Sequence, residues 1–194
     1  MTTKTDQIYI NLVIQGNTNA FATLVNKYKV LVYSVAFKLL NNKEEAEEVA
    51  QDTFVKAYKN IASFEGKSKF STWLYKIAYR NCLDVLKKRE NKYKFSVLED
   101  VTITQIKATE DTFISIERKE RSEILASCLE KLPDDERIIL TLFYYQELSL
   151  KEIIEVTGFS EANVKVKLHR ARKHLLIIVK NTVEPELIKH YGRK

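Results

Sequence analysis

Glycine and proline are scarce in this chain, with 4 glycines and 2 prolines among 194 residues. Both are frequent in the turns that join short strands, so their scarcity argues against a turn-rich β fold and favours long helices. No apolar run approaches the roughly 20 residues of a membrane span, and the first residues lack the basic and apolar regions of a secretory signal. We therefore expect a cytoplasmic protein without membrane insertion.

Patterns that mark metal centres and enzymes are missing as well. The two cysteines, Cys82 and Cys128, lack metal-type spacing, and we expect both to be reduced thiols. His169, His174 and His190 have no cysteine or carboxylate partner at ligand spacing. The chain has no glycine-rich phosphate loop, HExxH motif or nucleophile elbow. These absences predict a protein with no metal, cofactor, small-molecule substrate or enzymatic activity.

Positive charge is in excess and unevenly placed. The formal net charge of +6 and the isoelectric point near 9.1 favour a polyanionic partner. Residues 1–92 carry 15 Lys and Arg against 9 Asp and Glu, residues 93–117 carry 2 against 5, and residues 118–194 carry 15 against 12. The acidic middle segment has no sustained hydrophobic period. We predict an all-α fold with two helical domains (1–92 and 118–180), a flexible acidic linker (93–117) and a tail (181–194).

The stretch from Leu148 to Val179 predicts a helix-turn-helix. Ser149 and Glu152 have the spacing of a capping box at the start of a short helix. Gly158 can take the positive φ of a sharp turn, and Ser160 can cap the second helix. This pair of helices is a motif with which proteins enter the DNA major groove.

The second helix separates an apolar face from a basic one. Its apolar stripe follows helical spacing: Val164, Leu168, Ala171 and Leu175. The cap, the opposite face and its flanks offer side chains for bases and phosphates: Ser160, Ala162, Asn163, Lys165, Val166, Lys167, Arg170 and Lys173. The alternative is a solvated basic face on an ordinary core helix, which the capped, glycine-turned partner helix makes less attractive.

Residues 43–59 predict a helix with an acidic face that includes Glu48, Gln51, Asp52 and Val55. Acidic residues in the first turns complement the helix dipole, which is a purely structural explanation. A glutamine and a valine among the acids would also suit a docking face for a basic partner helix.

A polar, basic loop, residues 65–71, precedes a predicted helix from Trp73 to Arg89. One strip of that helix combines a tryptophan with cations: Trp73, Lys76, Ile77, Arg80, Asp84, Lys87 and Lys88. A stacking ring among phosphate partners is typical of a single-stranded nucleic-acid platform. The alternative, compatible with the first, is that Trp73 anchors the preceding loop.

Three segments, in this order, resemble bacterial RNA polymerase sigma factors of the extracytoplasmic-function (ECF) group of the sigma-70 family: AEEVAQDTFVKAY, FSTWLYKIAYRNCLDVLKKR and LPDDERIILTLFYYQELSLKEIIEVTGFSEANVKVKLHRARKHL. The resemblance covers about residues 10–180. It implies a two-domain helical protein that binds core RNA polymerase and directs promoter-specific initiation by recognising −35 and −10 elements. It also implies promoter DNA and an anti-sigma factor as partners, and a monomer when free.

The resemblance gives each surface a role. The helix that docks on the polymerase clamp helices would contribute Glu47, Glu48, Gln51, Asp52, Phe54 and Val55. The segment that opens and reads the −10 element would contribute Lys67, Ser68, Lys69, Phe70, Trp73, Lys76, Ile77, Arg80, Asn81, Lys87 and Lys88. The outer face of the helix from Glu161 to Lys173 would read the −35 element. Glu161-Ala162 and Val166 depart from the residues common in the family, which leaves the DNA sequence open.

Two other classes of protein are alternatives. A plain helix-turn-helix regulator would need neither the acidic face nor the Trp73 strip, and it would usually dimerise on a two-fold operator. A nucleic-acid enzyme would need a metal or nucleophile constellation, which no motif in the chain supplies.

Overall fold

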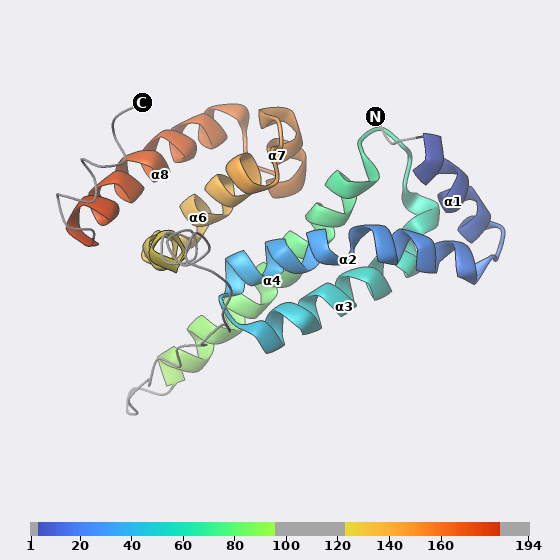
Figure 1. Ribbon diagram of the computed structural model, residues 1–194, viewed down its shortest axis with the longest axis horizontal. Helices are drawn as coiled ribbons and strands as arrows, with labels where there is room; N and C mark the ends of the chain where they lie inside the picture. The colour runs from blue at the N-terminus through green and yellow to red at the C-terminus, as the bar shows by residue number, and fades with distance from the viewer. Residues whose placement is uncertain (1–3, 96–122, 183–194) are drawn as a thin grey trace, which may run out of the picture.

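A computed structural model describes the backbone of residues 4–95 and 123–182 (Figure 1). The first half consists of α1 (Lys4–Ile14), α2 (Thr18–Leu40), α3 (Lys43–Asn60), the short turn η1 (Ile61–Ser63) and α4 (Phe70–Phe95). The second half consists of helical residues 123–130, α6 (Asp134–Leu140), the π-helical segment η2 (Thr141–Tyr145), α7 (Leu150–Thr157) and α8 (Glu161–Thr182). The described residues contain no strand, and the predicted all-α fold is confirmed. Most of the predicted linker and tail lies outside the described residues.

Asparagine side chains set the boundaries of the helices in the first half. Asn17 and Asn42 cap α2 and α3, since their side chains accept hydrogen bonds from the backbone N–H of Ala20 and Glu45. Asn41 ends α2 in the left-handed conformation, with φ at 47°. The resulting helices pack side by side, and α1 lies along α2. Their contact surfaces form one apolar cluster that includes Leu24 and Leu74.

The second half contains the predicted helix-turn-helix. The capping box is present, because Ser149 accepts from the Glu152 N–H while the Glu152 carboxylate accepts from the Ser149 N–H. Gly158 ends α7 with φ at +76°, the left-handed region in which glycine avoids a Cβ clash. The amide of Asn163 donates to the side chain of Ser160, which caps α8 as predicted.

Gly158→Ala should lower the free energy of unfolding by about 1 kcal/mol, measured as a shift of the urea midpoint. A Cβ at this position meets no atom within 4 Å, so the expected cost is that of the positive φ alone. Gly158→Asn is the matched control, because asparagine tolerates this conformation and should lose less. Equal losses for the two variants would contradict this explanation.

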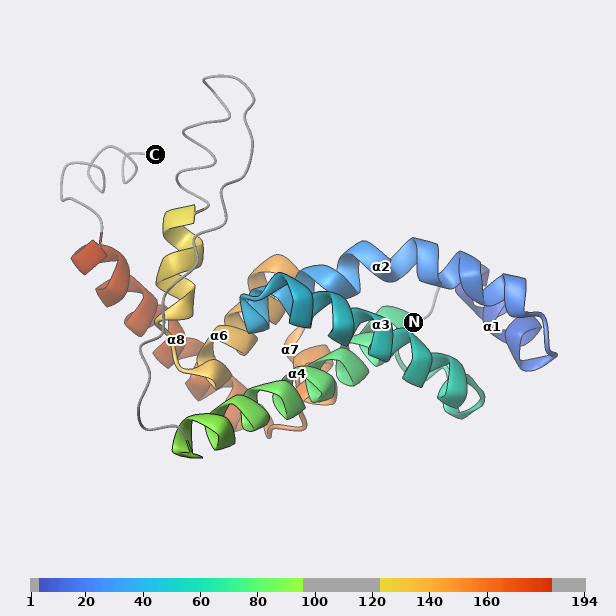
Figure 2. The same cartoon turned by 90° about the horizontal axis from the view of Figure 1, so that it is seen from below.

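A second apolar cluster joins the two halves into one body. It combines Val35 and Leu39 of α2 and Tyr79 of α4 with Leu142 and Ile153 of the second half. The helix pairs in contact across the boundary include α4 with α7 and α2 with α6. Figures 1 and 2 show α7 beside α4, and in Figure 1 α6 lies between α8 and α4. The closed arrangement therefore leaves one long side of α8 away from the first half.

Both cysteines are free and fully buried. Cys82 belongs to the cluster between the halves, and burial raises the pKa of its thiol to about 12. Within the described residues, no group of three or more His, Cys, Asp or Glu could hold a metal ion. No helix in that part of the chain combines the length and apolar character that crossing a membrane requires.

Candidate nucleic-acid interface

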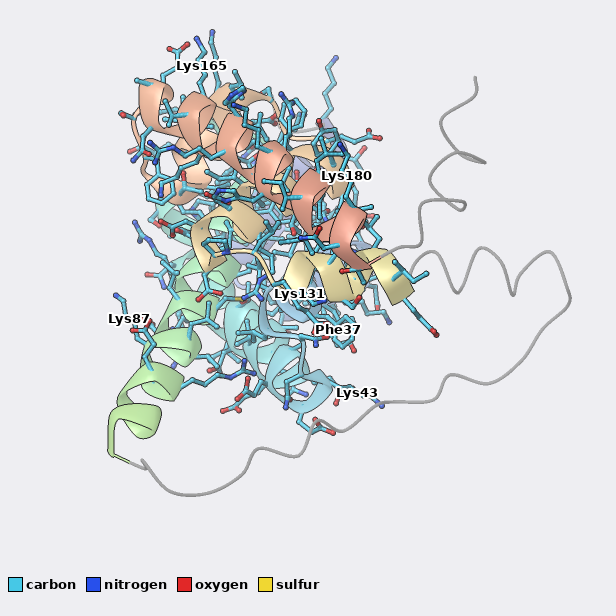
Figure 3. The ribbon with its side chains drawn as sticks, turned by 90° about the vertical axis from the view of Figure 1, so that its left-hand side faces the viewer. Phe37, Lys43, Lys87, Lys131, Lys165 and Lys180 are labelled. Atoms are coloured by element: carbon cyan, nitrogen blue, oxygen red, sulfur yellow. The ribbon has the colours of Figure 1, made fainter. Side chains whose placement is uncertain are left out.

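The outer face of α8 is open to solvent. Its inner stripe is buried as predicted: Val164, Leu168 and Ala171. The residues predicted to face DNA are exposed, with one exception: Ser160, Ala162, Asn163, Lys165, Val166, Arg170 and Lys173. In Figure 3, Lys165 points away from the body of the molecule, at the opposite end from Lys43. The face is therefore available to a partner in this conformation.

The exception is Lys167, whose side chain turns back toward α6. Its Nζ lies 2.7 Å from Asp135 Oδ2 and 5.2 Å from the centre of the Phe159 ring. Lys165 is exposed but pairs with Glu161 at 2.6 Å. Arg170 and Lys173 form no ion pair with another described residue, so they are the cations of this face that are free for phosphates.

The sequence prediction omitted one exposed residue of this face, His169. It is three residues after Val166 and four before Lys173, and such residues lie on one side of a helix. This helical spacing was the signal in the sequence that places His169 on the outer face.

Arg170→Ala should weaken binding to duplex DNA that contains the −35 element, measured with the full chain by fluorescence anisotropy. If Arg170 holds a phosphate, the loss should be similar for all sequences and the salt slope should fall by about one unit. If it reads a guanine, the loss should be about 1–3 kcal/mol and restricted to one base pair. Lys180→Ala, at the far end of α8, is the control with the same charge change. Unchanged binding of Arg170→Ala would remove this residue from the interface.

The acidic face of α3 is also exposed. Glu47, Glu48, Gln51 and Asp52 are exposed, and Val55 is 51% exposed. Beside them lies an aromatic residue that the prediction missed, Tyr58, at 43% exposure. It follows Val55 by three residues, so the acidic face ends in an exposed apolar patch. An acidic face with an apolar end suits a partner that offers cations around a hydrophobic groove.

Phe54 corrects the prediction for this face. It is only 9% exposed, and its ring meets Phe21 edge-on at 6.5 Å. It therefore supports α3 from inside and offers no ring to a partner. Its position seven residues before Ile61 and four after Ala50, both buried, places it on the inner stripe.

The aromatic residues before and within α4 form a compact stack. Phe70 lies 5.5 Å from Trp73 with rings nearly parallel, and Phe64 meets both rings at 5.4–5.5 Å. Trp73 is half-buried in this stack and so anchors the loop before α4. Because part of the indole remains exposed, both interpretations of Trp73 stand. Phe70 corrects the prediction, since at 1% exposure it cannot touch DNA.

Asn81 corrects the prediction a third time. It is 5% exposed, its amide donates to Thr53 Oγ1 at 3.1 Å, and its carbonyl accepts from Lys56. Asn81 thus ties α4 to α3 instead of facing a base. The remaining predicted cations of α4 are partly or fully exposed: Lys76, Arg80, Lys87 and Lys88. Half-buried Ile77 packs against the same core as Trp73.

The loop before α4 carries two lysines that already have carboxylate partners. Lys67 pairs with Glu65, both well exposed, and Lys69 Nζ lies 3.0 Å from Glu152 Oε1 of α7. Half-buried Ser68 lies between them. Burial favours a raised pKa for Glu152, but hydrogen bonds from Ser149 and Lys69 outweigh it and lower the pKa to about 2. The carboxylate is therefore charged at neutral pH, and this contribution to stability is lost only as the pH falls from above 4 toward 2.

Comparison with known proteins identifies the class. The Sigma-70 region 2 family model matches residues 24–92, and the Sigma-70 region 4 model matches residues 122–175. The chain is 38% identical over 175 residues to the ECF RNA polymerase sigma factor SigW of Bacillus subtilis (strain 168), which covers 86% of this chain and 92% of that protein. The chain belongs to the ECF group of the sigma-70 family.

Solved structures agree on the fold. The structure of CnrH in complex with the cytosolic domain of CnrY matches with a TM-score of 0.68 at 24% identity, covering 93% of this chain and 100% of that chain. The sigma factor RpoE from Bartonella quintana, in complex with the anti-sigma factor NepR, matches with a TM-score of 0.64 at 22% identity. The match covers 82% of this chain and 96% of that chain. Because the family models and the relatives place the chain in the sigma-70 family, the protein is a sigma factor, which directs promoter-specific transcription by RNA polymerase. Sigma factors are regulatory proteins.

Proposed function

We propose that three surfaces of this sigma factor divide the work of initiation. The acidic face of α3 with its apolar end binds core RNA polymerase. The loop before α4 and the exposed cations of α4 open and hold the −10 element. The outer face of α8 reads the −35 element. The observation that carries the proposal is the exposed outer face of α8, on a capped and glycine-turned helix-turn-helix, with two cations that pair with no other residue of the described ranges.

Recognition of the −35 element follows from the order of residues along α8. Ala162, Asn163 and Val166 lie in the first turns, which approach base edges in a major groove. Asparagine pairs bidentately with adenine, and the apolar side chains contact thymine methyl groups. Arg170 and Lys173 follow along the same face and hold phosphates, which fixes the register of the helix.

Opening of the −10 element needs preference for unpaired bases. The exposed part of the Trp73 ring can stack on a base only after the base has left the duplex. Lys76 and Arg80, three and seven residues further along, supply charge for the phosphates of the opened strand. The surrounding core of Phe64 and Phe70 keeps the indole fixed, so little entropy is lost when a base stacks on it.

We also propose an anti-sigma protein as a regulatory partner, supported by the RpoE complex with NepR. A protein that covers both the α3 face and α8 would block polymerase and DNA at once. The protein is expected to act in the cytoplasm, where its polymerase and DNA partners lie, and to have no catalytic activity of its own.

In vitro transcription tests the proposal. The purified chain with core polymerase should start transcripts at specific positions on a library of promoter fragments, and each component alone should not. Sequences enriched among the transcribed fragments should share two elements separated by a fixed spacing. Sequence-specific DNA binding without stimulation of core polymerase would instead identify a plain helix-turn-helix regulator.

A further inference from the structure

The capping box of α7 has a second use. Glu152 Oε2 accepts from the backbone and hydroxyl of Ser149 at 2.9 and 2.8 Å, which closes the start of α7. Its other oxygen, Oε1, faces the first half of the chain, where Lys69 lies at 3.0 Å and the hydroxyl of Thr72 donates at 3.3 Å. The Glu152 side chain is 17% exposed, so the carboxylate is largely shielded from solvent, while its partner Lys69 stays accessible. One carboxylate therefore holds the helix start and the neighbouring domain together.

A glutamine forms a second polar contact nearby. Tyr75 of α4 donates its hydroxyl to Gln146 Oε1 at 2.6 Å, and Gln146 Nε2 donates to Ser34 Oγ of α2 at 3.2 Å. Next to it, Lys38 Nζ lies 3.7 Å from the centre of the Tyr145 ring. Burial lowers the pKa of Lys38. Tyr75 is 2% exposed, so its buried hydroxyl would lose the hydrogen bond that it donates if the halves stayed packed without Gln146.

The closed arrangement cannot read both promoter elements at once. Elements centred near −35 and −10 are about 25 base pairs apart, which is about 85 Å along B-DNA. Helix α7 has 8 residues and is therefore about 12 Å long, and only residues 158–160 separate it from α8. The reading end of α8 is thus within about 30 Å of Lys69. The two halves must separate before both elements can be bound.

We propose that the free protein is held closed by a latch, formed by Glu152 on Lys69 and Thr72 and by Gln146 on Tyr75 and Ser34, and that promoter binding requires the latch to break. The inference rests on the proposed function, because that function assigns the loop with Lys69 to the −10 strand. In the closed state the Glu152 carboxylate occupies the position of a DNA phosphate on Lys69. A DNA strand that enters this loop competes directly with α7 for the lysine.

The polar contacts of the latch can be broken by competing anions. Lys69 is half exposed, with 54% of its side chain in contact with solvent, so salt and competing anions reach the pair. The apolar cluster between the halves, which includes Tyr79 and Ile153, supplies the apolar contact of the closed state, and the two polar contacts fix its register. Loss of one charge-assisted hydrogen bond should shift the equilibrium between the closed and open states by about tenfold.

Distances between the halves of the free protein test the latch. Spin labels on Lys59→Cys in α3 and Lys180→Cys in α8 report the separation by pulsed dipolar spectroscopy. Cys82 and Cys128 are replaced by alanine in this background, because Cys82 lies in the cluster between the halves and opening would expose it. The wild-type background should give one narrow distance. Glu152→Gln with Gln146→Met should give a broad distribution, with the ratio of open to closed molecules raised about tenfold or more. Glutamine keeps the capping box, so α7 itself should stay folded.

Glu155→Gln is the matched control, because it makes the same charge change on α7 at a residue without an ion pair in the described part of the chain. It should leave the distance distribution unchanged. Tyr75→Phe provides a second route to opening that removes only a hydroxyl and leaves the buried ring in place. Circular dichroism checks that each variant keeps its helical content.

Binding of single-stranded DNA gives a second readout. The opened variant should bind a −10 strand several-fold more tightly, because Lys69 is released, while its affinity for the −35 duplex should not change. A wild-type distribution that is already broad, or distances unchanged in both the double variant and Tyr75→Phe, would overturn the latch. Since the distance measurement uses neither polymerase nor promoter, failed transcription would contradict the proposed function alone.

Discussion

Glu48→Lys together with Asp52→Lys should abolish association with core RNA polymerase while leaving the helical content intact. Both carboxylates are exposed on α3, one turn apart, and neither forms an ion pair with another described residue. Reversal therefore removes no internal contact, and only a small cost from like charges along the helix is expected, on the order of a few tenths of a kcal/mol. A basic partner surface would then be repelled instead of attracted. Like-charge contacts of this kind cost several kcal/mol of binding free energy.

The measurement is co-elution with core polymerase on size exclusion. Glu123→Lys with Glu130→Lys is the matched control, because it makes the same change of net charge on exposed residues of the second half. That variant should bind normally. Full binding by the α3 variant would leave the acidic residues with a structural role only, as partners of the helix dipole.

Trp73→Ala should reduce open-complex formation roughly tenfold to hundredfold, while closed binding changes little. Stacking of one base on an aromatic ring is worth about 1–3 kcal/mol and is available only when the base is unpaired. The loss should therefore appear at the opening step, measured as permanganate reactivity of thymines near the start site. A template with a pre-opened bubble should largely restore activity, since the cost of opening has been removed.

The control for Trp73→Ala has to account for the aromatic stack around Trp73. The indole contacts Phe64 and Phe70, so its removal also loosens the loop before α4. Trp73→Phe keeps a ring in the stack and should retain most of the opening activity. Thermal melts of both variants separate loss of stacking on DNA from loss of fold. Equal opening by wild type and Trp73→Ala, with both folded, would make Trp73 a loop anchor only.

Local signals in the sequence were sufficient for helix boundaries. Asn42, Ser149 and Gly158 act on backbone groups within four residues, so their roles can be predicted from spacing alone. The same holds for the buried stripe of α8. The start of α4 was predicted three residues late, because the Lys69 carbonyl accepts from the Trp73 N–H and begins the helix earlier than the serine and threonine suggest.

Side chains whose surroundings come from distant helices were harder to predict. Asn81 lies three residues after Ala78, on the inner side of α4, and helical spacing could have revealed its burial. Phe70 is buried by Tyr28 and Phe64, which approach from other elements, and no local pattern indicates this. The contact of Lys69 with Glu152 joins residues far apart in the chain, and the π-helical turn before Gln146 has no sequence signature of its own.

The two-sided carboxylate of Glu152 limits how freely this protein can be recombined. Swapping the second half for that of a relative would be the natural way to give the chain a new −35 preference. Such a chimera keeps the closed state only if the donor places a carboxylate at the third position of α7, opposite Lys69. A donor with another side chain there would change basal DNA binding as well as sequence preference. The two halves are modular in the linear sequence, but at this residue their inheritance is coupled.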